Sequence, residues 1–309
     1  MWEALLYPEQ GFQWLLSALN FVPKEYFMTM DLYLNNALRL SKTTTKAYST
    51  SFSLGVRMLH KNIRPHIYSI YGFVRFADEI VDSSPVPAEV RSTLLSAFRE
   101  ETFIALREGI STNPIIHSFQ YTVNKYAISP RLITAFLDSM AMDLTETTHD
   151  QASFERYIFG SASAVGLMCL AVFMNGDTAE YERLEPHAIK LGEAFQKINF
   201  LRDIKADYSF RKRSYFPDIK PESFTSKQKS KLEKEIFEDF RIAREGIIQL
   251  PRCCRFGVYV AYNYYRTLTR KIQHCKAEDL LNRRIRVNNF RKLVVLKMAF
   301  LHHLFRTYP

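Results

Sequence analysis

Two pairs of aspartates could carry chemistry in this sequence, because each pair places two carboxylates on one face of a helix. Asp78 and Asp82 are four residues apart, and Asp203 and Asp207 repeat that spacing. Like charges at this spacing repel and destabilise a helix. The neighbouring residues are largely apolar, so burial of the carboxylates adds a further cost. Divalent cations would offset both costs, and Mg²⁺ prefers oxygen ligands such as carboxylates and phosphates.

Other polar residues share the helical faces of these pairs. At about 100° per residue, the first aspartate stripe covers an arc of roughly 60°, and the second covers about 80°. The first stripe consists of Tyr71, Arg75, Asp78 and Asp82, and the second of Gln196, Asn199, Asp203 and Asp207. Salt bridges to Arg75, Arg202 or Lys205 are an alternative to metal, and ordinary solvated helix faces are another. The spacing alone does not choose among these three.

The elements that would position these stripes are predicted to be helices. The 309 residues include only 10 glycines, and no proline falls between Pro130 and Pro186 or between Pro251 and Pro309. Such stretches without helix breakers favour long helices. Ser129-Pro130 is typical of an N-cap followed by proline at the first helical position. Helices are expected at 29–48, 64–83, 87–108, 114–126, 130–146, 153–175, 178–205, 226–248, 253–275 and 288–306.

Composition restricts partners and compartment only coarsely. The net charge of +10 suits nucleic acid, an anionic membrane surface or an anionic substrate. Four cysteines without metal-type spacing favour a reduced cytoplasmic protein, with peripheral contact at the inner face of the membrane as an option. The most hydrophobic run, Ala162 to Met174, is shorter than a bilayer span and fits a buried helix. Residues 1–28 form an N-terminal extension of uncertain role, ahead of one domain over 29–309.

Several blocks of the sequence, in order, resemble the squalene/phytoene synthase family. Gln196, Asn199, Asp203 and Asp207 match the second aspartate-rich motif of that family, and the first aspartate stripe matches the first motif. Ser49-Thr-Ser51-Phe52 resembles a segment that helps hold diphosphate. Further blocks begin at Met140, Tyr157 and Arg213, namely Met140–Leu144, Tyr157–Met168 and Arg213–Pro217. The resemblance extends from about Ser41 to Arg291.

Two positions depart from the family pattern in the block that starts at Tyr157. A tyrosine common in the family is replaced by Phe159, and a glycine is replaced by Ser163. A role of the missing hydroxyl would pass to Tyr157, Ser161 or Tyr71.

The resemblance implies an all-α, single-domain helical bundle of the isoprenoid-synthase type around a central apolar cavity. It implies head-to-head condensation of two geranylgeranyl diphosphates to phytoene, with Mg²⁺ (Mn²⁺ as a substitute) and no nucleotide cofactor. The expected metal ligands are Asp78, Asp82, Asn199, Asp203 and Asp207. The four aspartates, Tyr71 and Tyr157 are expected to be catalytic. Diphosphate is expected to bind Ser49, Ser51, Arg75, Gln196, Asn199 and Arg202, and the cavity lining is expected to include Phe52 and Phe159.

Other functions remain open from sequence. Within the same chemistry, the chain could be a squalene or dehydrosqualene synthase that uses farnesyl diphosphate, with NADPH in the reductive case. A non-catalytic scaffold related to the family is the alternative of another class. Nucleic-acid binding would leave the aspartate stripes without a purpose, so no nucleic-acid partner is expected. A basic region near the C-terminus, Arg283 to Lys292, suits either the diphosphate site or a solvated or membrane-facing surface.

Overall fold

The computed structural model describes residues 24–82, 85–211, 213–305 and 307–308. The described residues form helices and no named strand; Thr148 and Ser214 make one isolated bridge. The elements in chain order are α2 Lys24–Tyr48, α3 Thr50–Arg57, α4 Arg64–Asp82, α5 Ala88–Glu108, α6 Pro114–Lys125, α7 Pro130–Thr145, α8 Gln151–Ile158, η2 Phe159–Ser163, α9 Ala164–Met174, α10 Thr178–Arg211, η3 Pro221–Ser223, α11 Ser226–Ile247, α12 Arg252–Gln273, α13 Ala277–Asn282 and α14 Asn289–Leu304.

Helix ends follow the capping chemistry of the sequence. The Ser129 side chain caps α7 by accepting a hydrogen bond from the Arg131 amide, and Pro130 is the first helical residue, as predicted. Asn113 caps α6 in the same way, ahead of Pro114. Asn175 and Gly176 take positive φ after α9, which ends that helix and starts the turn into α10. Helix α2 already begins at Lys24 rather than at residue 29, and residues 1–23 of the predicted extension lie outside the described part of the chain.

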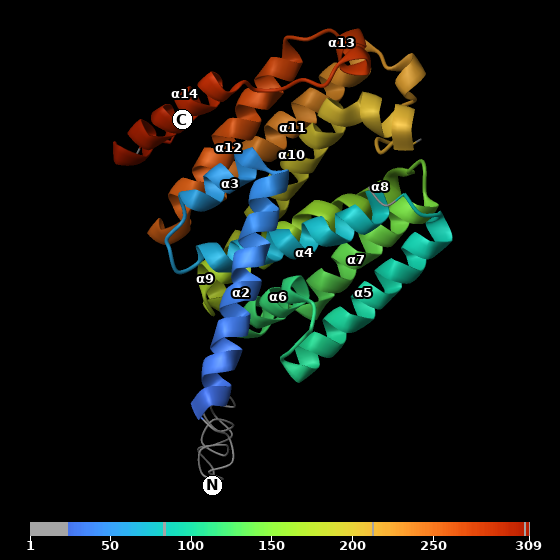
Figure 1. Cartoon of the computed structure of the whole chain (residues 1–309). Coiled ribbons are helices and arrows are strands. Elements are labelled where there is room, and N and C mark those ends of the chain that lie inside the picture. Colours follow the sequence, from blue (N-terminus) through green and yellow to red (C-terminus); the bar gives the residue numbers. More distant parts are fainter. Residues whose placement is uncertain (1–23, 83–84, 212, 306, 309) are drawn as a thin grey trace.

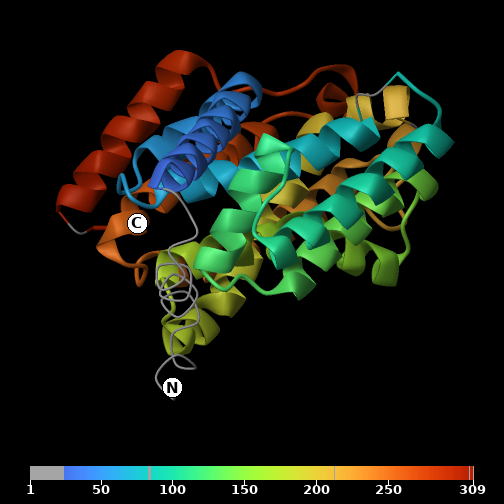
Figure 2. The ribbon, with the colours of Figure 1, turned by 60° about the horizontal axis from the view of Figure 1, so that its bottom comes forward.

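Two hydrophobic clusters form the core. One gathers buried residues of α4, α5, α6, α7 and α9, and the other gathers those of α8, α10, α11, α12 and α13. Figure 1 shows the first group of helices in the lower half of the view and α11 to α14 in the upper half, and Figure 2 shows α14 at the outer edge. Helix α2 packs against α4 and α6, and α12 packs against α3 and α14.

The predicted helix 153–175 contains a π-helical segment. Helix α8 passes into η2 at Phe159 and then into α9 at Ala164. Here the chain lies very close to its neighbours: a Cβ added at Gly160 would lie 2.2 Å from the Ala135 carbonyl oxygen of α7. Gln151–Met174 has the length and apolar composition of a membrane span, but 56% of its apolar window is buried in the protein. It is a core helix here, as the sequence predicted for Ala162–Met174.

Candidate active site

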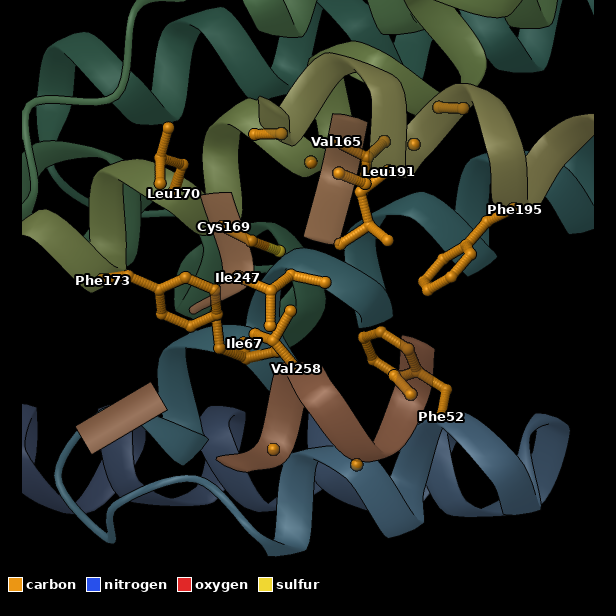
Figure 3. A pocket seen from close by; sticks show the side chains of 18 of the residues that line it. Phe52, Ile67, Val165, Cys169, Leu170, Phe173, Leu191, Phe195, Ile247 and Val258 are labelled. Carbon is orange, nitrogen blue, oxygen red and sulfur yellow. The ribbon is translucent and has the colours of Figure 1, made fainter. Parts of the chain in front are cut away.

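An apolar cavity of about 340 Å³ lies among α3, α4, α9, α10, α11 and α12. Its walls include residues of both hydrophobic clusters, such as Ile67 and Ile247. Figure 3 shows Phe52 and Phe195 at one end and Leu170 and Phe173 at the other. A cavity lined so largely by hydrocarbon side chains suits an apolar ligand and excludes water.

Both aspartate-bearing helices line this cavity with the turns that precede their aspartates. Helix α10 contributes residues at helical spacing from Leu184 to Asn199, and Asp203 follows Asn199 by one turn. Helix α4 contributes Ile67, Ile70, Tyr71 and Val74, and Asp78 follows Val74 by one turn. Both aspartate stripes therefore start within the cavity lining, and their aspartates lie just beyond its end.

Polar side chains meet at this end of the cavity. Gln196 Nε2 donates to Ser161 Oγ, Asn199 Nδ2 donates to Gln196 Oε1, and Tyr265 OH donates to Asn199 Oδ1, each at 3.4 Å. The Tyr265 ring stacks on Phe195 with centroids 4.0 Å apart. The predicted residues Gln196 and Asn199 are thus held in fixed orientations at the polar end of an apolar cavity.

Tyr71 also lines the cavity, as part of an aromatic pair. Its ring stacks on Phe52 with centroids 4.6 Å apart. Burial raises the pKa of Tyr71, and a hydrogen bond with Ser49 and the charge of Arg75 partly oppose that rise. The hydroxyl of Tyr71 therefore stays protonated at neutral pH and can donate a hydrogen bond.

A second, polar pocket of about 350 Å³ lies beside the N-terminus of α3. Its lining includes four cationic side chains, and within the described part of the chain it includes no carboxylate. Ser49 is the N-cap of α3 and accepts from the Phe52 amide at 3.2 Å. Helix N-termini, arginines and hydroxyls are the groups that bind phosphates. We call this the anion pocket; it consists of Tyr48, Ser49, Thr50, Ser51, Arg202, Tyr264, Leu268, Arg284, Ile285, Arg286, Val287 and Lys292.

The anion pocket and the apolar cavity adjoin each other. On α3, Ser51 lines the pocket and Phe52 lines the cavity. On α12, Tyr264 lines the pocket and the next residue, Tyr265, lines the cavity. Arg202 of α10 lines the pocket one turn after Asn199 lines the cavity. The two hollows together suit a ligand with an anionic head and an apolar tail.

The carboxylates of α4 are paired with arginines. Arg75 forms ion pairs with Asp78 and Glu79, and its guanidinium lies 4.3 Å from the centroid of the Tyr48 ring at the anion pocket. Asp82 Oδ1 lies 2.7 Å from Arg213 Nη1. Arg75 itself, predicted to bind diphosphate, does not line the anion pocket but adjoins it through Tyr48.

The carboxylates of α10 reach the same region. Asp203 accepts from Arg202 at 2.5 Å and pairs with Arg284 of the anion pocket at 2.6 Å. Asp207 is 8% exposed, and its carbonyl oxygen accepts from the Arg213 amide at 3.0 Å. Arg213 thus joins the end of α10 to Asp82 at the end of α4, which brings the two aspartate stripes to one end of the cavity.

Asp143 of α7 is a buried site residue to which the sequence analysis gave no role. Its oxygens accept from Tyr157 and Tyr215, each at 3.0 Å, and Arg213 Nη1 lies 3.3 Å away. Burial raises the pKa of Asp143 to about 7, and the positive charge of Arg213 opposes the rise. The signal for this network was present in the blocks at Met140 and Arg213, but spacing does not show that they meet.

Tyr157 belongs to this network and not to the cavity. It is 3% exposed, packs against Tyr215 and Phe200, and is not among the residues that line the cavity. Its hydroxyl donates to Asp143, and the catalytic role expected of Tyr157 stays a prediction. Tyr157 positions the group that holds Arg213.

Phe159 was predicted to line the cavity, and it is not among the residues that line it. Phe159 is the first residue of η2, and its side chain is 38% exposed. The π-helical segment turns Ser161 and Ala162 into the cavity instead, and Gly160 against α7. Of the three residues to which the missing hydroxyl's role could pass, Ser161 and Tyr71 line the cavity and Tyr157 does not.

The side chains at this end fit Mg²⁺ by their chemistry. In the part of the chain that the structure describes, no three or more His, Cys, Asp or Glu side chains gather into a metal site. Mg²⁺ commonly takes only one or two carboxylates and completes its shell with water and substrate phosphate oxygens. Four aspartates beside an anion pocket match that requirement.

Comparison with known proteins gives one consistent result. The family model described as squalene/phytoene synthase matches residues 45–291, which include every predicted site residue. Phytoene synthase of Pseudescherichia vulneris is 27% identical over 250 residues, covering 73% of this chain and 79% of the relative. Presqualene diphosphate synthase of Rhodopseudomonas palustris is 31% identical over 173 residues, covering 55% of this chain and 59% of the relative.

The fold has solved counterparts. The crystal structure of a dehydrosqualene synthase superposes with a TM-score of 0.75 at 21% identity, covering 88% of this chain and 98% of that one. The predicted all-α fold of the isoprenoid-synthase type is therefore confirmed.

Proposed function

Because the chain belongs to the squalene/phytoene synthase family, we propose that it joins two prenyl diphosphates head to head and that its product is phytoene. The family is of the prenyltransferase type. The observation that carries the proposal is the direct junction of an apolar cavity with a cationic pocket whose described lining contains no carboxylate. A prenyl diphosphate has the matching shape, an apolar chain that ends in an anion.

The anion pocket would bind diphosphate. Arg202, Arg284 and Lys292 donate charge-assisted hydrogen bonds to its oxygens, and the hydroxyls of Ser49 and Ser51 add neutral ones. Because Arg202 and Arg284 also hold Asp203, diphosphate competes with a carboxylate for these arginines. Binding of the head group would therefore release Asp203.

Asp78, Asp82, Asp203, Asp207 and Asn199 would hold Mg²⁺, or Mn²⁺ in its place. When bound, the metal supplies Lewis-acid stabilisation of the departing diphosphate. Through its bond to Asp82, Arg213 keeps this carboxylate directed toward the site, and Asp143 in turn holds Arg213.

The cavity would protect the carbocations. Loss of the first diphosphate gives an allylic cation, which the C2–C3 double bond of the second chain attacks. Loss of a proton to the released diphosphate closes the three-membered ring and gives a cyclopropylcarbinyl diphosphate. This intermediate loses the second diphosphate, and rearrangement followed by loss of another proton gives the 1–1′ linked hydrocarbon. Dry walls prevent capture by water. The faces of Phe52, Tyr71, Phe195 and Tyr265 can stabilise positive charge near the polar end.

A second candidate is condensation of two farnesyl diphosphates to a C30 product. It is favoured by the relative named presqualene diphosphate synthase and by the dehydrosqualene synthase fold. The same residues would act in the same roles, and only the length of chain accepted would differ. Phytoene synthesis as proposed uses no nucleotide cofactor, whereas the reductive squalene route of the second candidate would use NADPH. No nucleic acid enters either reaction as proposed.

The test is a product assay on the purified full chain with Mg²⁺ and, in parallel, with chelator. Geranylgeranyl and farnesyl diphosphate are supplied separately, each with and without NADPH, and the extracted hydrocarbon is identified by mass. The expected result is a C40 hydrocarbon that requires metal and no reductant.

A C30 product would replace phytoene synthesis with the second candidate, and NADPH dependence would identify the squalene route. No product from either substrate, from folded protein with metal, would refute both candidates and favour the non-catalytic scaffold.

A further inference from the structure

The last helix carries an apolar surface that faces away from the protein. Within α14 and its C-cap residue, Lys297 and Arg291 are exposed, and Ala299 is buried. Seven large apolar side chains of this segment are between 43% and 76% exposed. They are Phe290, Leu293, Val294, Met298, Phe300, Leu304 and Phe305.

These seven side chains form one continuous face. At 100° per residue they span an arc of roughly 160°, and Lys297 is the charged residue of the described helix that falls within it. Ala299 and Leu296, on the opposite side, pack against the cluster around α12. An ordinary surface helix has a single apolar stripe, which it turns inward. Helix α14 has an inward apolar side and, in addition, a second apolar face that is exposed in the described structure.

The helix lies at the edge of the molecule and starts at the anion pocket. Figures 1 and 2 both show α14 at the periphery, beside α12. Val287 and Lys292, on either side of its first residue, line the anion pocket. Lys292 also donates to Thr50 at 3.3 Å, which ties the first turn of α14 to the start of α3.

The positive charge beside the apolar face of α14 favours an anionic bilayer as the surface that covers it. Arg291 and Lys297 border or interrupt the apolar arc, and the chain as a whole carries +10. Apolar side chains with basic residues among them are the pattern of helices that lie at the surface of anionic bilayers. At 16 residues, α14 is about 24 Å long, shorter than the roughly 30 Å hydrocarbon core of a bilayer, so it suits the plane of the interface.

We propose that α14 docks on an anionic lipid bilayer, with its apolar arc inserted among the acyl chains near the headgroups and Arg291 and Lys297 against lipid phosphates. The docking rests on α14 alone. Its purpose rests on the proposed function, since prenyl chains and their hydrocarbon product partition into lipid. A docked α14 would bring the anion pocket close to the headgroup level.

The experiment is flotation of the full chain with vesicles of phosphatidylcholine alone and of phosphatidylcholine mixed with phosphatidylglycerol. The wild-type chain should float with the mixed vesicles. The variant L293S/F300S/L304S should bind them more than about tenfold more weakly, because three inserted side chains are lost. The variant K297Q should bind about fivefold more weakly, the effect of one basic charge at an anionic surface.

The matched control is L94S/I104S, which removes two exposed apolar side chains of α5, 45% and 41% exposed. It should float like the wild type. Equal flotation of the α14 triple variant and the wild type would overturn the proposal, as would a wild-type chain that does not float. So would a wild-type dimer in light scattering that the triple variant converts to monomer, because a second copy would then cover α14.

Turnover of dispersed substrate without vesicles separates the two hypotheses. A chain that floats as predicted but makes no product keeps the docking and loses the proposed function. A chain that makes product but never floats keeps the function and loses the docking.

Discussion

Single residues at the polar end of the cavity are held by opposite charges. Asp78, Asp82 and Asp203 each pair with an arginine, so the carboxylates that the sequence marks as metal ligands are also salt-bridged. The sequence offered salt bridges and divalent cations as alternatives. The structure contains salt bridges, and the proposed reaction exchanges them for metal at Asp203, where diphosphate would compete for Arg202 and Arg284.

Replacing either Asp78 or Asp203 with Ala should lower kcat/KM for the proposed substrate by more than about 100-fold, because each change removes a ligand to the proposed metal. The fold should survive, since like-charge repulsion within the pair is also relieved. Steady-state turnover and circular dichroism measure the two effects. Asp138→Ala, which removes an exposed carboxylate paired with Arg99, is the control. Near-normal turnover in both site variants would disprove the metal assignment.

The relative placement of side chains could be predicted from the sequence where the residues share one helix. A period of 3.6 is enough to place Tyr71 with Asp78, and Gln196 with Asn199 and Asp203. Contacts between segments far apart in the sequence could not be predicted in this way. Arg213 reaches Asp82 across 131 positions, and that contact depends on how α10 ends rather than on any local pattern.

At the scale of elements, close approach of helix backbones shapes the cavity. The segment η2 lies against α7 through Gly160 and against α10 through Gly192, where an added Cβ would lie 2.8 Å from the Ala162 carbonyl oxygen. A regular helical pattern predicted one helix through this region. The π-helical segment, which local propensity does not reveal, is what turns Ser161 and Ala162 toward the cavity.

Gly160→Ala should destabilise the protein by about 1–3 kcal/mol, the usual cost of forced overpacking. The new methyl group would meet a backbone carbonyl that no side-chain rotation can move. Chemical denaturation measures the loss. Gly166→Ala is the matched control, since its added Cβ would lie 3.2 Å from the Ala188 carbonyl oxygen and should cost less. Equal midpoints for wild type and Gly160→Ala would contradict the packing described for η2.

The packing of α4 on α6 predicts a pH dependence. His66 is buried beside Tyr126 and Thr122, and burial lowers the pKa of His66 to about 4. The unfolded chain binds a proton on this residue below about pH 6.5, while the folded chain resists it. The stability that the neutral ring contributes is therefore present above pH 6.5 and is lost as pH falls toward 4.

The variant His66→Gln should lose less stability than the wild type between about pH 7 and pH 4.5. Urea midpoints at several pH values measure this difference. Exposed His60→Gln should follow the wild-type curve. Parallel curves for wild type and His66→Gln would show that His66 titrates normally in the folded protein.

At the scale of the whole molecule, the cavity lies between two hydrophobic clusters, so its length is set by residues far from the aspartates. Composition predicted an all-α protein because scarce glycine and long proline-free stretches favour long helices. The central apolar cavity was implied by the family resemblance. The depth of the cavity could not be predicted, since it depends on side chains from six helices meeting at once.

Bulk at the deep end should therefore select shorter substrates. Cys169 of α9 lines the cavity near Phe173, and Cys169→Phe should lower the ratio of kcat/KM for geranylgeranyl over farnesyl diphosphate by roughly tenfold. Ala171→Phe, on the same helix but outside the lining, is the control. Competition between the two substrates measures the ratio, and an unchanged ratio in Cys169→Phe would place the chain termini elsewhere.

The consecutive residues Tyr264 and Tyr265, whose rings meet at 88°, separate the anion pocket from the cavity by the width of one residue. For a prenyl diphosphate, the head group in the anion pocket would fix where the chain starts, and the deep end of the cavity would limit how far it extends. A change that moves the bound head group along α12 would shift every carbon of the chain by the same distance. Selection of chain length can thus be altered at two places, the deep end of the cavity and the anion pocket. A change at the anion pocket would act without contacting the hydrocarbon chain.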